Sequence, residues 1–259
     1  MPKVLNHKQM VITVHSIHED GVPDRFVPAE VFQSKLANFL AAIKEADRAT
    51  LSTTSRQVYV SYLKTGSAEI GFREAEVENA PRKSAFDTLL TCATAVKDGD
   101  AAAVSKFDRV VAKLANLTAG VGVKFSHLTI ALDNAPTVRV DGFFERQVKQ
   151  IRKDQKKPDF RTPFFKGTSE ESFDGIVKEV DLRGRAPLCK IMLSGTENQI
   201  DCTFDNLDTD SIRDLLDKRS WVEGKAIYDG FSGLPVRFEI RHYRKIKGSG
   251  DPAAWVSPR

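Results

Sequence analysis

Residues 221–228 read Trp-Val-Glu-Gly-Lys-Ala-Ile-Tyr, and this stretch decides how the second half of the chain folds. Its apolar and polar residues alternate, which predicts a half-buried strand. Gly224 interrupts the strand midway, flanked by Val222 and Ala226. Small residues inside a strand let a strongly coiled strand bend. The stretch therefore predicts a strongly bent strand of the kind that a small closed barrel needs.

The sequence on either side of this stretch supplies four more strands and one helix. We expect strands at 173–182, 188–193, 199–204 and 236–243, and a helix from Asp210 to Arg219. The resulting order is strand, strand, strand, helix, strand, strand, which a five-stranded Greek-key barrel of OB type requires.

The segment 172–247 resembles the OB-fold domains. The residues that carry the likeness are Gly175-Ile-Val177 in the first strand and Val222–Tyr228 in the fourth. The resemblance implies a five-stranded β-barrel, and it implies that the second and third strands and their loops could hold single-stranded nucleic acid.

The first half of the chain predicts a sheet covered by about three helices. Apolar stripes at helical spacing predict helices that begin near Pro28 and that cover 86–96 and 104–117. Alternating stretches predict five strands, at 10–17, 57–64, 67–76, 125–132 and 137–143. Such an element order is typical of an α+β domain.

The expected fold class is therefore α+β, with a sheet-and-helix domain followed by an OB-like β-barrel. The expected boundaries are 1–145 for the α+β domain, 146–171 for a basic linker, 172–247 for the barrel and 248–259 for a tail.

The positive charge of the chain is concentrated in one short segment. The net charge is +4, and residues 1–145 carry 17 basic and 17 acidic side chains. Residues 146–166 carry eight basic and two acidic side chains, interleaved with Phe160, Phe164 and Phe165. A connector is often charged because it has no core to fill. Basic and aromatic residues in alternation also suit a single strand, which they hold by phosphate contacts and base stacking.

A second basic region lies in the last strands of the barrel. Residues 218–247 hold eight basic and three acidic side chains, while aspartates crowd the helix before them. The second and third strands lack outward aromatic residues, so Phe231 and Tyr243 are the better stacking candidates there, although both also suit the core.

No local motif predicts catalysis, a metal or a cofactor. Cys92, Cys189 and Cys202 form no CxxC pair, so we expect buried thiols rather than a disulfide framework or a zinc site. His15 and His18 lack further ligands for a metal. A catalytic site assembled from distant carboxylates would leave no local trace, so an enzyme remains the third hypothesis.

The leading hypothesis is a cytoplasmic, non-catalytic binding or adaptor protein that contacts single-stranded nucleic acid. In that hypothesis Phe164 and Phe165 stack on bases, and the phosphate contacts are Lys153, Lys156, Lys157, Arg161, Arg241, Arg244 and Lys245. No apolar run could span a membrane, and no secretory signal is recognisable at the amino terminus.

The alternative is an accessory subunit of a bacterial multiprotein system with no nucleic-acid role. In the leading hypothesis the α+β domain meets a protein partner or a second copy of itself, whereas in this alternative the barrel and the tail are the protein-docking elements. The tail would dock through Trp255, because tryptophan is favoured at the centres of protein interfaces.

Overall fold

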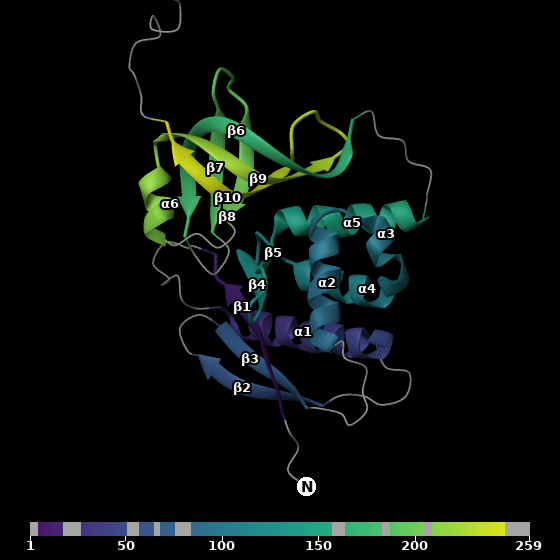
Figure 1. The fold of residues 1–259 in the computed structure, drawn as a ribbon. Coiled ribbons are helices and arrows are strands. Elements are labelled where there is room, and N and C mark those ends of the chain that lie inside the picture. The colour runs from purple at the N-terminus through teal and green to yellow at the C-terminus, as the bar shows by residue number, and fades with distance from the viewer. Residues whose placement is uncertain are drawn as a thin grey trace, which may run out of the picture. The chain divides into compact units, whose positions relative to one another are not determined.

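The structure, a computed structural model, describes residues 5–17, 27–50, 57–64, 68–75, 84–156, 164–182, 187–204 and 209–246. The chain divides into two compact units. The sheet unit comprises Met1–Arg161 with Arg183–Ala186, and the barrel unit comprises Thr162–Leu182 with Pro187–Arg259. Each unit contains one five-stranded sheet, so the expected mixed α+β class is confirmed (Figure 1).

The sheet unit is built on an open antiparallel sheet. Its strands are β1 (Leu5–His15), β2 (Val58–Lys64), β3 (Ala68–Ala75), β4 (His127–Leu132) and β5 (Val138–Val140). Their order across the sheet is β2-β3-β1-β4-β5. Alternate residues of β1, such as Met10, Ile12 and Val14, enter the core on one face.

Helices pack against that apolar face (Figure 1). Those that do are α1 (Ala29–Thr50), α2 (Ala85–Lys97) and α5 (Gly142–Lys156), while α3 (Ala101–Val104), the short 3-10 helix η1 (Ser105–Phe107) and α4 (Asp108–Thr118) pack mainly on these helices and on one another. The rings of Phe39 on α1 and Phe72 on β3 lie 5.6 Å apart, centroid to centroid. Helix α1 and the sheet therefore pack in one hydrophobic core.

Helix α5 occupies residues that the sequence assigned in part to a linker. The Asp141 carboxylate accepts hydrogen bonds from the backbone N–H groups of Phe143 (3.0 Å) and Phe144 (3.1 Å), which caps the helix. Phe144, Val148 and Ile151 are fully buried in the core. The apolar stripe of α5 is narrow and interrupted by many charged residues, so the helical periodicity could not be recognised in the sequence.

The barrel unit consists of β6 (Lys166–Asp181), β7 (Leu188–Leu193), β8 (Gln199–Phe204), α6 (Thr209–Leu215), β9 (Arg219–Asp229) and β10 (Arg237–Lys245). The strands pair in the closed order β10-β8-β7-β6-β9 (Figure 1). Strand β10 runs parallel to β8, and every other pair is antiparallel. Strand β6 begins earlier than expected, because its first half pairs with β9 from Lys166 onward.

Gly224 stands where β9 meets the backbone of β10. A Cβ atom at this position would lie 1.9 Å from the carbonyl oxygen of Glu239, a distance no side chain tolerates. The register between the two strands shifts beside it, between Ile240 and His242. The sequence predicted a bend at this glycine, and the structure shows in addition that the backbone of β10 comes too close to admit a side chain.

The three cysteines are free thiols buried in the two cores, as expected from their apolar neighbours. Burial raises the pKa of Cys92 to about 12, so this thiol is unreactive at neutral pH. Among the helices in the described ranges, none is both long and apolar enough to cross a membrane.

Candidate nucleic-acid interface

Three half-exposed phenylalanines belong to the barrel unit. Phe164 is 51% exposed, Phe165 is 58% exposed and Phe231 is 49% exposed. Phe164 and Phe165 directly precede β6, and Phe231 lies in the loop between β9 and β10. Half-exposed aromatic side chains leave part of their surface accessible to a planar group.

The pairing of β6 with β9 brings these segments together. Lys166 lies opposite Asp229, so the residues before β6 reach the residues after β9. The backbone N–H of Phe164 donates to the carbonyl oxygen of Gly230 (3.2 Å). The Phe165 ring meets the Tyr228 ring edge to face, with centroids 5.5 Å apart. We call Phe164, Phe165, Tyr228 and Phe231 the aromatic end of the barrel.

Local backbone features hold the loop at the aromatic end. The Asp229 carboxylate accepts a hydrogen bond from the N–H of Phe231 (2.9 Å), which closes a tight turn. Gly230 has φ +83°, a left-handed conformation that glycine adopts without strain. Phe231 therefore sits on a turn held by hydrogen bonds, and Phe164 is bonded to Gly230 of the same turn.

The sequence did not point to Tyr228 as a member of this site, whereas it did suggest Tyr243. Tyr243 is partly buried and packs against the barrel core, as Tyr228 does, and it pairs with Val222, away from the three half-exposed phenylalanines. Burial raises the pKa of the Tyr228 hydroxyl, as does the neighbouring Glu171 carboxylate. The register of β6 against β9 would have revealed Tyr228, but register is not visible in the sequence.

The three cations expected on β10 differ in their surroundings. The Arg241 guanidinium contacts the Glu170 carboxylate at 2.7 Å, and the Lys245 ammonium contacts the Asp214 carboxylate. Arg244 is exposed, and it forms no ion pair with any residue that the structure describes. Exposed ion pairs contribute only about 0.2–1 kcal/mol, so a polyanion can compete for these side chains, but the local positive charge is reduced.

The same compensation of charge extends over the rest of the barrel. Arg219 binds Asp174 through two nitrogens, at 3.0 and 2.5 Å. These hydrogen bonds hold the pKa of Asp174 below its usual range. Lys190 contacts Glu179 at 2.7 Å, a hydrogen bond that raises the pKa of the lysine. The barrel surface is thus a mosaic of both signs, and its aromatic end is the more distinctive feature.

The remaining candidate residues lie in α5 or outside the described ranges. Lys153 is an exposed residue of α5, and Lys156 ends that helix. Lys157, Arg161 and Trp255 lie outside the described residues.

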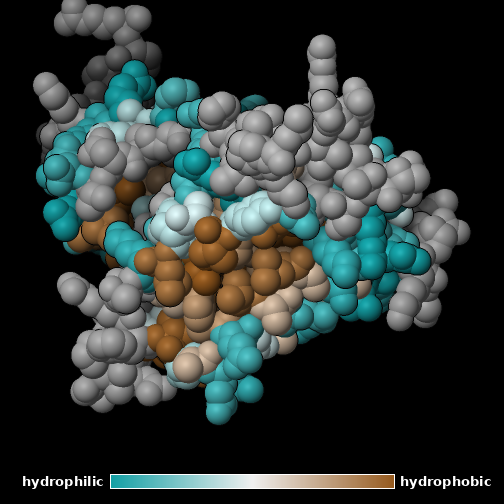
Figure 2. Space-filling view, turned by 90° about the horizontal axis from the view of Figure 1, so that it is seen from below, coloured by the Kyte–Doolittle hydropathy of each residue, from teal (hydrophilic) through white to brown (hydrophobic). Residues whose placement is uncertain are grey.

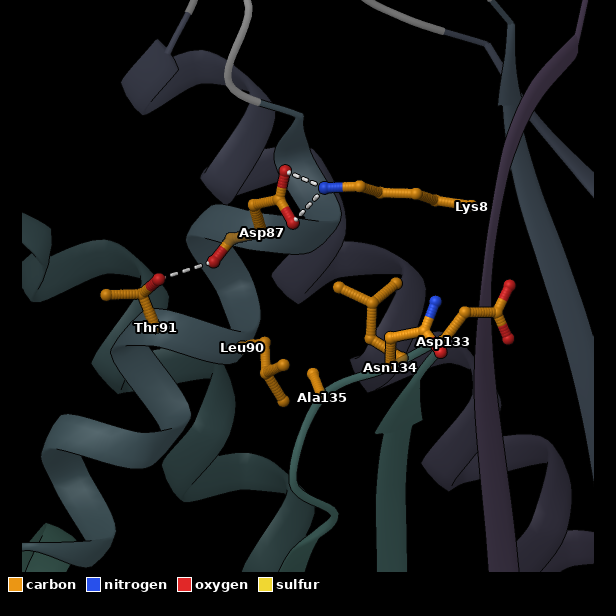
Figure 3. A pocket seen from close by; sticks show the side chains of 8 residues that line it. Lys8, Asp87, Leu90, Thr91, Asp133, Asn134 and Ala135 are labelled. Atoms are coloured by element: carbon orange, nitrogen blue, oxygen red, sulfur yellow. Dashed lines mark hydrogen bonds and ion pairs between the residues drawn. The ribbon is translucent and has the colours of Figure 1, made fainter.

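A separate pocket of about 480 Å³ lies in the sheet unit (Figure 3). Its lining residues are Lys8, Asp87, Leu90, Thr91, Leu132, Asp133, Asn134 and Ala135. The Lys8 ammonium lies 2.8 Å from both carboxylate oxygens of Asp87. The Thr91 hydroxyl donates to the backbone carbonyl of Asp87 (2.7 Å). Charged groups therefore line one side of the pocket, and Leu90 and Ala135 line another.

The chemistry of this pocket does not favour proton transfer. Burial raises the pKa of Asp87, but hydrogen bonds from Lys8 and Ser84 outweigh that effect, and the net shift is downward. Asp87 is accordingly an ionised, paired carboxylate near neutral pH. A general acid or base needs a pKa close to the working pH, which Asp87 does not have.

A pair of stacked histidines lies on the sheet face that points away from the helices. The rings of His15 and His127 are nearly parallel, with centroids 4.2 Å apart. The Ser126 hydroxyl lies 3.1 Å from Nδ1 of His127. In the described ranges, no group of three or more His, Cys, Asp or Glu side chains could hold a metal ion.

Comparison with known proteins adds no assignment to this geometry. No protein-family model, no curated protein and no solved structure matches the chain. Any function must therefore be argued from the residues described above.

Proposed function

We propose that the barrel unit is an OB-type domain that binds single-stranded nucleic acid without catalysis. The observation that carries the proposal is the aromatic end, where half-exposed Phe164 and Phe165 precede β6 and half-exposed Phe231 lies on the turn after β9, to which Phe164 is hydrogen-bonded. Solvent-exposed aromatic rings are costly on a surface with no partner, and bases offer a flat partner of matching size.

The strand arrangement supports the OB assignment. Three antiparallel strands are followed by a helix and two further strands, and β10 closes the order by pairing in parallel with β8. That is the arrangement which the resemblance of 172–247 implies. Since a fold hosts many functions, the nucleic-acid role rests on the aromatic residues rather than on the fold.

Stacking would supply most of the binding free energy in this proposal. Each base that stacks on an aromatic ring contributes about 1–3 kcal/mol, and the contact tolerates any base. We therefore expect weak sequence preference. The rings of Phe164 and Phe165 are the main contacts, with Phe231 as the third.

Phosphate contacts would come from cations close to these rings in the chain. Arg161 and Lys166 flank the two phenylalanines, and Lys156 and Lys157 precede them by a few residues. On β10, Arg241 and Lys245 already have acidic partners, and Arg244 pairs with Trp221 at the end of β9 away from Tyr228, so β10 is the weaker source of phosphate contacts. Each neutralised phosphate should contribute about −0.7 to the slope of log K against log salt.

The test is fluorescence anisotropy of a labelled oligo(dT) or oligo(U) strand titrated with the full chain at low and at moderate salt. Phe164→Ala combined with Phe165→Ala should weaken binding by more than about 30-fold, because stacking on two bases, at about 1–3 kcal/mol each, is removed. The matched control is Val123→Ala, which also truncates an exposed apolar side chain but lies in the sheet unit, 78% exposed.

Absence of binding at low salt would contradict the proposal. So would binding that the double alanine variant leaves unchanged, because contact would then be electrostatic alone. A second pair of variants tests the electrostatic contribution. Arg161→Ala should lower the affinity and make the dependence of log K on log salt less steep. Arg109→Ala, at an exposed residue of α4, should change neither.

The alternative role in a protein assembly, with Trp255 as anchor, remains a prediction. A pull-down that requires Trp255 and is insensitive to nuclease would favour it.

A further inference from the structure

The sheet unit has an edge strand whose apolar side chains are exposed. Strand β2 is the last strand of its sheet and pairs only with β3 among the strands that the structure describes. Val60 and Leu63 are each 63% exposed, and Tyr59 is 37% exposed. An edge strand of this kind usually carries charges or is covered, because it would otherwise pair with another chain.

Helix α1 extends this apolar surface. Phe39 of α1 contacts Phe72, which is the β3 residue directly opposite Val60. Leu40, next to Phe39, is 40% exposed. Figure 2 shows a broad hydrophobic area on this side of the molecule, bordered by hydrophilic residues. We call Leu40, Tyr59, Val60 and Leu63 the apolar edge.

The strand register shows which side chains of β2 share a face. Val60 and Leu63 lie opposite Phe72 and Ile70, which face the helices, whereas Tyr59 and Lys64 lie opposite Arg73 and Glu69 on the other face. The register shifts between Val60 and Tyr62, so the two apolar residues share a face although they are three positions apart.

We propose that the apolar edge joins two copies of this chain by antiparallel pairing of β2 with β2. A two-fold axis between Ser61 and Tyr62 would place Val60 of each copy opposite Leu63 of the other. The same axis would place Tyr59 opposite Lys64, an aromatic and a cation that attract each other. Within 59–64 the cross-strand pairs are then Tyr59 with Lys64, Val60 with Leu63 and Ser61 with Tyr62.

This self-complementarity is the reason to choose a second copy over an unrelated partner. A two-fold interface requires a surface that matches itself. Shifting the strands by one residue would place Val60 or Leu63 opposite a side chain on the other face of the sheet. The strand is about 24 Å long at about 3.4 Å per residue. An interface of one strand and one helix flank belongs to the small class, below about 1,200 Å² in total, so the dimer should be weak.

Sedimentation equilibrium of the full chain, from about 10 to about 300 µM, tests the proposal. The wild-type chain should pass from monomer toward dimer over this range. Val60→Asp combined with Leu63→Asp should remain monomeric, whereas Val123→Asp, a matched change at another exposed valine, should dimerise as the wild type does. A wild-type monomer at every concentration, or a dimer unaffected by the double substitution, would overturn the proposal.

Cysteine cross-linking tests the register and does not depend on the aspartate variants being folded. An equimolar mixture of Val60→Cys and Leu63→Cys chains should form a disulfide-linked mixed dimer under mild oxidation. Each variant alone should cross-link much less, because Val60 of one copy does not face Val60 of the other. The natural cysteines are buried and contribute little background. Equal cross-linking in all three samples would contradict the two-fold register.

Discussion

The two five-stranded sheets of this protein differ in their edges: one sheet is closed and the other is open. In the barrel unit every strand has two neighbours, because β9 and β10 close the order. In the sheet unit the order ends at β2 and β5, and the exposed side chains of the apolar edge lie on β2 and α1. Closure thus removes the unpaired edge, whereas an open sheet of equal strand number leaves one available for a partner.

Closing the barrel brings the backbones of neighbouring strands so close together that a few positions accept no side chain. In the barrel, β9 approaches β10 so closely that Gly224 admits no side chain. The open sheet buries its apolar face under helices instead, and β4 is buried along its whole length. The barrel should therefore be the more sensitive to a single backbone change, and the sheet unit to changes in helix packing.

The largest expected effect separates the two units. Gly224→Val should unfold the barrel, with a loss of more than about 4 kcal/mol, because Cβ would overlap the Glu239 carbonyl. Fluorescence of Trp221 in β9, measured here and below in a Trp255→Phe background because the chain has two tryptophans, reports on the barrel, and far-ultraviolet circular dichroism reports mainly on the helices of the sheet unit. The barrel transition should disappear while the helical transition remains.

Gly233→Ala is the matched control in the same unit. Its Cβ would lie 3.9 Å from the Phe164 ring, an ordinary contact, so stability should change by less than about 0.5 kcal/mol. Simultaneous loss of both transitions in Gly224→Val would show that the units do not fold independently.

A second, smaller effect concerns a lysine buried in the sheet unit. Lys35 is 4% exposed, its ammonium donates to the Ala119 carbonyl, and it lies 4.6 Å from the centre of the Phe125 ring. Burial, with a contribution from nearby Lys124, lowers its pKa from 10.5 to about 8. The folded chain therefore releases this proton at a lower pH than the unfolded chain.

This shift makes the sheet unit more stable as pH rises from about 8 to about 10.5, since only the unfolded chain still binds the proton there. Because the ammonium is partly solvated, we expect the free energy of unfolding to rise by about 1–2 kcal/mol more in the wild type than in Lys35→Met. Urea unfolding followed by circular dichroism at pH 7 and pH 10 measures it. Lys44→Met, an exposed lysine of the same helix, should keep the wild-type pH dependence.

The smallest expected effect is an ion pair on the barrel. Asp174→Asn should cost about 0.5–1 kcal/mol at pH 7, because the carboxylate accepts hydrogen bonds from Arg219 and Ser194. The pKa of Asp174 is lowered on folding, so this stability is present above about pH 4 and is lost as pH falls through the folded pKa.

Trp221 fluorescence during urea unfolding at pH 7 and at pH 2.5 checks this difference. Asp210→Asn removes a carboxylate that is 93% exposed and lies 3.6 Å from Arg213, so it should have almost no effect at either pH. An equal loss in both variants would mean that net charge, rather than the Arg219 pair, decides stability.

Much of the local structure could be predicted from the chain itself. The strands 188–193 and 199–204 match β7 and β8 residue for residue, because buried and exposed side chains alternate along them. Helix α5 was not predicted, since Phe144, Val148 and Ile151 are few among many charged residues. A core can use such a narrow stripe only when neighbouring elements already surround it.

The candidate site was predicted in part. Phe164 and Phe165 were identified from their place among basic residues, and both are half-exposed. Their proximity to Tyr228 and Phe231 depends on the pairing of β6 with β9, which are separated by an entire sheet hairpin and a helix. The acidic partner of Arg241 was equally hidden, because Glu170 lies 71 positions away.

The sequence by itself determined the faces of the strands, the need for glycine at 224 and the burial of the thiols, because side-chain period and residue size act over a few neighbouring positions. Only the tertiary structure decided which aromatic rings meet, which cations are compensated and which strand is left at an edge. Those features depend on register between distant segments, and register is set by the sum of all contacts in the folded unit.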